Sequence, residues 1–223
     1  WLFGKNVTKR GNFFVIKNAI DAKKFSFDDE MRKSSRNNLG ITDEFIVGYL
    51  GRVITAKNPK FVVEVFRELL NRQQKSKLLF VGDGELLSEI VSLVESYKIS
   101  DKVIFTGSRN DTERMYAAMD VYCFPSLWEG LGISLIEAQA SGLPCVCSEN
   151  VPMEAYVTRL VHQLSLSENY SVWVDKILSL QNEKRKDTYE EIKESGYDIQ
   201  ASTTRIYNFY CTIWEKIWAK QAE

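Results

Sequence analysis

Net charge of one sign is almost absent from this sequence. Lys and Arg total 29 and Asp and Glu total 30 among 223 residues, which gives a formal net charge of −1 at pH 7. A protein with this balance has no chain-wide attraction for nucleic acid or for an anionic membrane. We therefore expect no nucleic-acid partner, and any site for an anion has to be built locally.

Histidine and paired cysteines are equally scarce. The single histidine, His162, lies in "LVHQLSL" and is expected to be a core or surface residue rather than a catalytic one. The four cysteines form no C-x-x-C pair, and Cys123, Cys145 and Cys147 stand in apolar, strand-like segments. Free cysteine in such places behaves as a small hydrophobic residue. We expect reduced core thiols in a cytoplasmic protein, without a redox or metal-binding role.

Long apolar runs are missing as well. No run approaches the roughly 18 residues that a membrane-spanning helix needs, and no signal peptide opens the chain. The chain begins without Met, at "WLFGKNVTKRG", which we interpret as the start of a piece of a longer protein.

Short apolar runs alternate regularly with helical patterns. With 44% hydrophobic and 26% charged residues, the composition is that of a globular protein with a sizeable core. Continuous apolar runs are typical of parallel strands that are buried on both faces. The predicted strands are "FFVI" (13–16), "FIVGYL" (45–50), "KLLFVG" (77–82), "KVIFTG" (102–107), "DVYCFPS" (120–126) and "PCVCS" (144–148).

Helix signals fill the gaps between these runs. Asn58 and Pro59 mark the start of one helix, a second is predicted over about 85–97, and Asp111 is expected to cap a short third one. Strand signals stop after about residue 168, and three helices follow, the last near 200–219. We expect residues 1–223 to form one α/β domain, a parallel sheet flanked by helices with a helical C-terminal tail.

Ligands bind open parallel sheets at the carboxyl ends of the strands, which singles out the loops at 51–58, 82–85, 107–111 and 126–132. The segment "GDGELLSEI" begins like a dinucleotide-binding fingerprint. However, Leu87 replaces the third glycine, and the next strand ends without an acid for a ribose. We expect Gly82 and Gly84 to form a tight turn, either beside a ligand or as a purely structural feature.

Two cations stand in the loop that follows Gly51. Arg52 and Lys57 precede a predicted helix N-terminus. A guanidinium fork, a point charge and a helix dipole all favour phosphate. Either residue alone would be interpreted as a solvated charge, but a second loop of the same kind favours an anion site.

That second loop belongs to "SLWEGLGISLIEAQASGLP", residues 126–144. Glu129 and Glu137 are eight positions apart, and the turn between them leads into a helix predicted over about 133–141. We expect Glu137 to accept both hydroxyls of a ribose and Glu129 to reach a sugar attached to the diphosphate. The alternative is that one acid pairs with the helix dipole while the other lies on the solvent face. Glycine lets the backbone approach a ligand, so the amides expected to face it are those of Gly130, Leu131 and Gly132.

These residues carry a resemblance to a known family. "EGLGISLIE" resembles the E-x(7)-E signature of retaining glycosyltransferases of the GT-B fold, in the large family four. Four other segments resemble further family motifs in the expected order: "NAIDAKKF" (18–25), "GRVITAK" (51–57), "VGDGEL" (81–86) and "VIFTGSRND" (103–111). The chain departs from the pattern at Ala19 and Asn58, where the family usually has glycine.

The resemblance implies that the chain is the C-terminal, donor-binding half of a two-domain enzyme with a Rossmann-like sheet. The acceptor-binding N-terminal domain would precede residue 1, and residues 1–25 would form the interdomain segment and first strand. Arg52 and Lys57 would bind the diphosphate, Glu129 the transferred sugar and Glu137 the ribose, with Arg52, Lys57 and Glu129 as the catalytic set. The remaining donor-binding positions would be Gly51, Gly82, Asp83, the backbone of Ser108 and Arg109 at the base, and the amides of Gly130, Leu131 and Gly132.

By the same resemblance, the enzyme would use a UDP- or GDP-linked sugar to build bacterial surface polysaccharide. It would need no cofactor and no metal, because cations and helix dipoles neutralise the leaving diphosphate. Its partners would be the nucleotide sugar and the N-terminal domain, through which it could associate with a membrane. The isolated domain would bind the donor without transferring sugar. The alternatives are a GT-B sugar-nucleotide epimerase and a non-catalytic nucleotide-binding module.

The last predicted helix carries an apolar stripe. In this fold the final helix commonly crosses back to the other domain, so we expect part of the stripe to be exposed. Its residues are Ile206, Tyr207, Tyr210, Trp214, Ile217 and Trp218.

Overall fold

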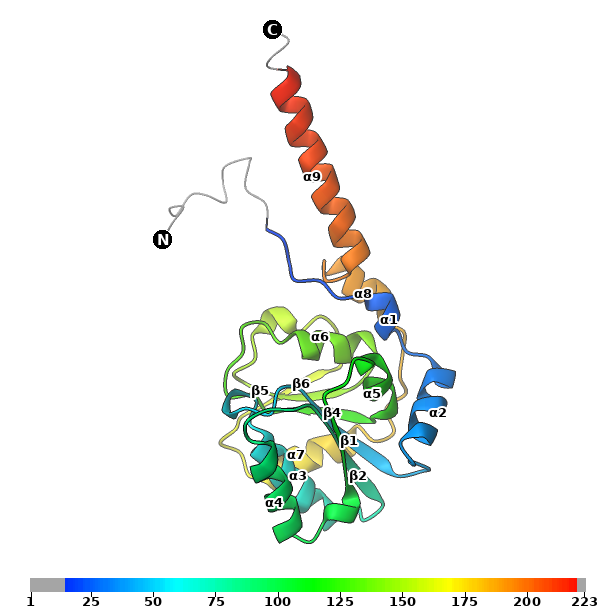
Figure 1. Cartoon of the computed structure of the whole chain (residues 1–223), viewed down its shortest axis with the longest axis vertical. Coiled ribbons are helices and arrows are strands. Elements are labelled where there is room, and N and C mark those ends of the chain that lie inside the picture. Colours follow the sequence, from blue (N-terminus) through cyan, green and yellow to red (C-terminus); the bar gives the residue numbers. More distant parts are fainter. Residues whose placement is uncertain (1–14, 220–223) are drawn as a thin grey trace.

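The computed structural model describes the backbone of residues 15–219 and the side chains of residues 15–215. Its centre is a sheet of six parallel strands in the order β3-β2-β1-β4-β5-β6 (Figure 1). This is the strand order of a doubly wound, Rossmann-like fold. The predicted parallel α/β sheet is thus confirmed. The strands are β1 (Phe45–Leu50), β2 (Ser76–Val81), β3 (Val103–Gly107), β4 (Val121–Phe124), β5 (Cys145–Ser148) and β6 (Val161–Leu164).

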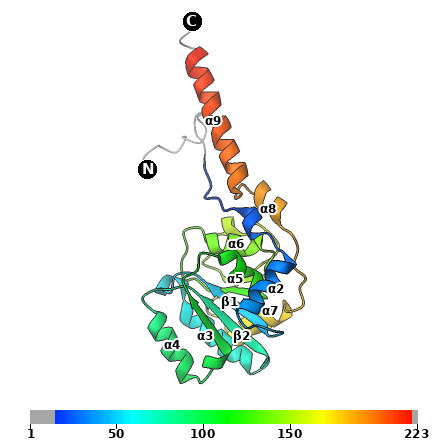
Figure 2. The same cartoon turned by 45° about the vertical axis from the view of Figure 1, so that its right-hand side comes forward.

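Helices cover both faces of this sheet. The α-helices are α1 (Ala22–Phe25), α2 (Asp29–Asn38), α3 (Pro59–Leu70), α4 (Leu87–Ser96), α5 (Thr112–Ala118), α6 (Ile133–Ala140), α7 (Tyr170–Ser179), α8 (Tyr189–Glu194) and α9 (Ile199–Ala219). Short 3-10 turns are η2 (Thr55–Lys57), η3 (Ser100–Lys102) and η4 (Met153–Ala155). In Figures 1 and 2, α3, α4 and α7 lie on one face, and α2, α5 and α6 lie on the other.

The apolar runs are continuous because each strand feeds two cores. In β1, Ile46 and Leu50 pack with residues of α5 and α6, whereas Val47 and Tyr49 pack with residues of α3, α4 and α7. Successive side chains of a strand point to opposite faces. Both faces of β1 are therefore buried. Three of the four free cysteines are buried in β4 and β5, as predicted.

Two strand predictions differ from the structure. Val15 and Ile16, the described part of the predicted strand 13–16, are exposed and not in a strand, whereas residues 13 and 14 lie outside the described part. Conversely, β6 was not predicted. Among the described residues this edge strand pairs with β5 alone, and its sequence "VHQL" is partly exposed and half polar. An edge strand needs no continuous apolar run, so that signal is missing.

Asn58 and Asp111 directly precede helices, as predicted, but neither side chain caps its helix. Asn58 precedes Pro59 at the start of α3, but it has φ 51° and its side chain makes no capping hydrogen bond. Asp111 precedes α5, yet its carboxylate accepts two hydrogen bonds from the Arg109 guanidinium instead of capping the helix. A charged, bidentate partner competes successfully with the helix amides for this carboxylate.

Helix α9 rises away from the sheet layers, with α1 and α8 near its base (Figures 1 and 2). Tyr207, Tyr210 and Trp214 are exposed, which confirms that part of the predicted apolar stripe is uncovered. The side chains of Ile217 and Trp218 lie outside the described residues. None of the described helices combines the length and the apolar character needed to cross a membrane.

Candidate functional site

The four loops singled out in the sequence meet at the carboxyl edge of the sheet. Backbone hydrogen bonds tie each of them to a neighbour. They are Gly51 N to Val81 O (3.1 Å), Val53 N to Asp83 O (2.9 Å), Gly82 N to Gly107 O (2.9 Å) and Leu127 N to Ala56 O (2.8 Å). The loop bearing Arg52 and Lys57 is therefore fixed directly to the loop bearing Glu129.

Glycine in the 82–84 turn is required by the neighbouring loop. A Cβ atom added to Gly82 would lie 1.9 Å from the Gly51 carbonyl oxygen, and one added to Gly84 would lie 2.5 Å from that of Val53. Gly84 also begins a turn, since its carbonyl oxygen accepts the Leu87 amide at 3.0 Å. Asp83 stabilises it further, since its Oδ1 accepts the Gly84 amide at 2.7 Å. That Gly51, Gly82 and Asp83 contact the donor stays a prediction.

Lys57 and Glu129 form an ion pair between the two loops. The Lys57 Nζ donates to Glu129 Oε1, and the same oxygen accepts the Ser126 hydroxyl at 2.7 Å. Only 17% of the Lys57 side chain and 7% of the Glu129 side chain are exposed. The ammonium also lies 5.3 Å from the centre of the Phe124 ring. Glu129 therefore has a side-chain partner of opposite charge on the neighbouring loop.

Arg52 contrasts with Lys57. Its side chain is exposed, and within the described part of the chain its guanidinium has no hydrogen-bond or ion-pair partner. Its carbonyl oxygen accepts the Tyr49 hydroxyl at 2.8 Å, which anchors the backbone of the loop. Burial, with a smaller contribution from the Glu129 charge, raises the pKa of Tyr49. Arg52 is thus a cation without a partner among the described side chains, on a backbone that hydrogen bonds hold in place.

Glu137 lies one turn into α6, half-buried against α5. Its Oε2 accepts the Tyr116 hydroxyl at 3.1 Å, and the same hydroxyl lies 3.1 Å from the Ser134 carbonyl oxygen. Burial raises the pKa of Glu137, while the Tyr116 hydrogen bond and the charge of Lys24 act in the opposite direction. Glu137 is therefore not on the solvent face, and this part of the alternative interpretation of the two glutamates is wrong.

The turn between the glutamates is open. Gly132 precedes α6 with φ 90°, which favours glycine. A Cβ atom added to Gly130 would meet nothing within 4 Å. The amides of Gly130, Leu131 and Gly132 donate to no group in the described range. The start of α6 thus offers unsatisfied donors at its positive end.

The remaining predicted positions lie outside the loops at 51–58 and 126–132. Ser108 and Arg109 are exposed after β3, and the Arg109 guanidinium is bound to Asp111 at 2.8 and 2.7 Å. Their backbone role stays a prediction. His162 lies in the edge strand β6, whereas the four loops follow β1, β2, β3 and β4. Burial lowers the pKa of His162. No cluster of three or more metal-ligating side chains occurs among residues 15–215.

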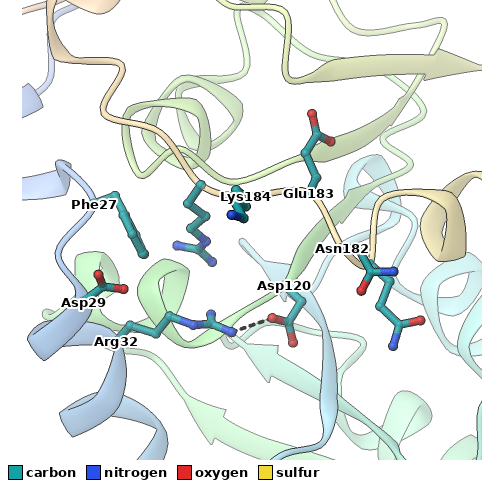
Figure 3. A pocket seen from close by; sticks show the side chains of 9 residues that line it. Phe27, Asp29, Arg32, Asp120, Asn182, Glu183 and Lys184 are labelled. Carbon is teal, nitrogen blue, oxygen red and sulfur yellow. Dashed lines mark hydrogen bonds and ion pairs between the residues drawn. The ribbon is translucent and has the colours of Figure 1, made fainter.

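A hollow of about 400 Å³ lies elsewhere, near the amino end of β4 (Figure 3). Three of its charged side chains, those of Arg32, Asp120 and Arg185, are bound to other groups of the protein. Arg32 pairs with Asp120, and the Arg185 guanidinium donates to the carbonyl oxygens of Tyr116 and Ser141. This hollow is therefore a junction of elements at the opposite edge from the candidate site.

Two residues of the site were missed in the sequence. Ser126 stands three positions before Glu129, and Tyr116 lies on α5, the short helix whose start was predicted at Asp111. A hydroxyl on an apolar helix was the available signal for Tyr116, because a buried tyrosine hydroxyl usually finds a partner. Its pairing with Glu137 bridges 21 positions and was not visible in the pattern.

Known proteins resemble this chain in sequence and in fold. Residues 31–198 match the family described as glycosyl transferases group 1. The putative glycosyltransferase EpsF of Bacillus subtilis is 32% identical over 221 residues, covering 97% of this chain and 58% of that protein. The UDP-Gal:alpha-D-GlcNAc-diphosphoundecaprenol alpha-1,3-galactosyltransferase of Escherichia coli is 32% identical over 138 residues, covering 60% of this chain and 36% of that protein.

A solved structure shares the fold. HepE of Anabaena, in complex with UDP-glucose, matches with a TM-score of 0.68 at 19% identity, over 92% of this chain and 57% of that chain. The present chain spans little more than half the length of EpsF and of HepE. The six-stranded parallel sheet with its helical tail is that of the C-terminal domain of a GT-B glycosyltransferase. The chain belongs to the glycosyl transferases group 1.

Proposed function

We propose that residues 1–223 are the donor-binding half of a retaining glycosyltransferase that acts in bacterial surface polysaccharide biosynthesis. The observation that carries the proposal is the junction of the two loops. Lys57 and Glu129 meet there; one loop also carries the exposed guanidinium of Arg52, and the other the unsatisfied amides at the start of α6. Cations and helix amides suit a diphosphate, and carboxylates suit sugar hydroxyls.

In this proposal each residue takes one part of the donor. Arg52 and Lys57 bind the diphosphate, whose negative charge grows as its bond to the sugar breaks. The amides of Gly130–Gly132 add the positive end of α6. Preorganised donors of this kind are each worth about 2.7–4 kcal/mol of barrier lowering. Because these groups supply the stabilisation, the proposed reaction needs no metal ion.

Glu137 accepts the ribose hydroxyls, Glu129 contacts the transferred sugar, and the base lies against the backbone of Ser108 and Arg109. The relative from Escherichia coli is named for a UDP-Gal donor, and HepE was solved with UDP-glucose. We therefore propose a UDP-linked donor rather than a GDP-linked one.

The acceptor belongs, in this proposal, to a separate N-terminal domain, since EpsF is considerably longer than the matched region. Residues 1–25 would connect the two domains. The enzyme would act in the cytoplasm, with any association with a membrane made through the N-terminal domain.

Nucleotide binding tests the proposal. UDP at about 100 times its dissociation constant adds roughly 2.7 kcal/mol of stability, which for a domain of this size raises the melting temperature by about 5–10 °C. We expect this shift with UDP and smaller shifts with GDP and ADP, measured by differential scanning fluorimetry. The absence of a shift with all three nucleotides would contradict the proposal.

Arg52→Ala localises the binding. Because the guanidinium acts on phosphate, this variant is expected to lose UDP affinity about tenfold or more while its affinity for uridine is unchanged. Arg72→Ala is the matched control. Arg72 is an exposed arginine just after the C-terminal end of α3, and its guanidinium pairs with Asp175. An equal loss of UDP and uridine binding in Arg52→Ala would show that Arg52 only supports the fold.

A further inference from the structure

The Lys57–Glu129 pair joins two groups that the proposed function assigns to different parts of the donor. Lys57 is assigned to the diphosphate and Glu129 to the sugar, yet here the ammonium is bound to the carboxylate. Both side chains are largely shielded from water, and the hydrogen bond from Leu127 N to Ala56 O holds their loops together. Without a ligand, the charges of Lys57 and Glu129 therefore neutralise each other.

A diphosphate that binds Lys57 must come close to Glu129. The ammonium has three donors, so it can contact a phosphate, but the phosphate then stands beside a carboxylate of the same sign. As Lys57 turns to the phosphate, the described hydrogen bond left to Glu129 Oε1 is that of the neutral Ser126 hydroxyl. A shielded carboxylate that loses its cationic partner is costly. UDP alone offers Glu129 an added negative charge and no hydroxyl of a transferred sugar.

An intact sugar nucleotide differs in this respect. The hydroxyls of its sugar are donors, and they lie beyond the diphosphate, where the proposal places Glu129. They replace the lost partner of the carboxylate at the moment when Lys57 turns to the phosphate. We propose that Glu129 and Lys57 exchange partners on donor binding, so that Glu129 selects the intact sugar nucleotide against the free nucleoside diphosphate.

The exchange also acts after the sugar has left. The product UDP no longer supplies hydroxyls to Glu129, and the carboxylate competes with the diphosphate for Lys57 again. Glu129 therefore weakens the hold of the site on its product. This inference rests on the proposed function, because it assigns the diphosphate to Lys57 and the sugar to Glu129.

The test is a comparison of UDP with a UDP-sugar in Glu129→Gln. Glutamine keeps the size of the side chain and removes its charge. By titration calorimetry of residues 1–223, we expect UDP to bind about tenfold more tightly to the variant than to the wild type. The probe for the intact donor is whichever of UDP-glucose, UDP-galactose and UDP-N-acetylglucosamine stabilises the wild type most. Its affinity should stay unchanged or fall, so the preference for it over UDP should drop at least tenfold.

Glu44→Gln is the matched control. Glu44 pairs with Lys77 at 2.8 Å, with 18% and 22% of the two side chains exposed, at the amino end of β1. The same substitution there should leave both affinities unchanged. Ser126→Ala provides a second variant whose expected effect has the opposite sign. It removes the neutral hydrogen bond to Glu129, so the carboxylate depends more on Lys57, and UDP should bind more weakly than in the wild type.

The outcomes separate the inference from the function. Failure of wild-type residues 1–223 to bind UDP and every UDP-sugar overturns the proposed function itself. If the wild type binds both but Glu129→Gln changes the two affinities equally, the partner exchange is wrong while the donor site stands. UDP binding that is unchanged or weaker in Glu129→Gln, or stronger in Ser126→Ala, also overturns the exchange.

Discussion

Glu137 is a carboxylate held where its charge is disfavoured. Burial raises its pKa, and the groups that favour its charge are the Tyr116 hydroxyl on α5 and Lys24 on α1, whose ammonium also pairs with Glu113 at 3.0 Å. Only the charged form accepts both hydroxyls of a diol. The position of Tyr116 therefore bears directly on the proposed ribose contact.

Removal of the Glu137 charge tests that contact. Glu137→Gln should bind UDP more weakly while its affinity for 2′,3′-dideoxy-UDP is almost unchanged, because the carboxylate acts on the diol. A charge-assisted hydrogen bond is worth about 1.5–3 kcal/mol, which corresponds to a loss of roughly 10- to 100-fold in affinity. Titration calorimetry with both nucleotides checks this, and an identical loss for the two would mean that Glu137 is only structural.

Tyr116→Phe tests the pH dependence of the same contact. The ribose contact requires ionised Glu137, so it should weaken as the pH falls through the pKa of that carboxyl. Loss of the Tyr116 hydroxyl removes a group that lowers the pKa. The pH at which the preference for UDP over 2′,3′-dideoxy-UDP is half lost should therefore move upward in the variant.

The ratio of the two affinities cancels the titration of the phosphate itself. A profile of this ratio that is identical in Tyr116→Phe and the wild type would show that Tyr116 only fills the core.

At the scale of elements, the site depends on loops that approach one another through glycine. Gly82 has φ 138°, and a Cβ atom there would overlap the Gly51 carbonyl oxygen, whereas the space around Gly130 is open. The first glycine serves the assembly of two loops. The second is not required by any described neighbour, which leaves room for a ligand.

A pair of alanine variants separates these two uses of glycine. Gly82→Ala should destabilise the fold by about 1–3 kcal/mol, as overpacking does, and should lower the melting temperature by about 2–4 °C per kcal/mol. Gly130→Ala should melt like the wild type but bind UDP-sugar more weakly, because its methyl group enters the space of the ligand. Equal melting temperatures for Gly82→Ala and the wild type would contradict the close approach of the loops.

The sequence was most informative where local pattern and sheet geometry act together. Parallel strands end at one edge, so the runs at 45–50 and 120–126 were enough to bring Arg52, Lys57 and Glu129 into one neighbourhood. The edge strand β6 lacked a continuous apolar run and was missed. The Lys57–Glu129 pair spans 72 positions, and each charge was assigned to a ligand rather than to the other. Partners so far apart are chosen by tertiary packing, which no local signal reports.

At the scale of the whole molecule, the proposal describes one wall of a two-domain cleft. Proximity and orientation can supply about 7–11 kcal/mol of a two-substrate reaction's barrier lowering, and a donor site alone cannot hold both reactants. We expect residues 1–223 to bind the donor but to release UDP from UDP-sugars only by slow hydrolysis, far below the complete protein with its acceptor. A coupled assay of UDP release checks this, and comparable turnover by the two would contradict the division into halves.

The central claim is that the donor lies against the loops at 51–58 and 126–132. A crystal structure of residues 1–223 with UDP tests it most directly. We predict that the diphosphate contacts Arg52, Lys57 and the amides of Gly130–Gly132, with both ribose hydroxyls on Glu137. UDP bound instead in the hollow beside Asp120, or bound at the carboxyl edge without contact to these residues, would contradict the account.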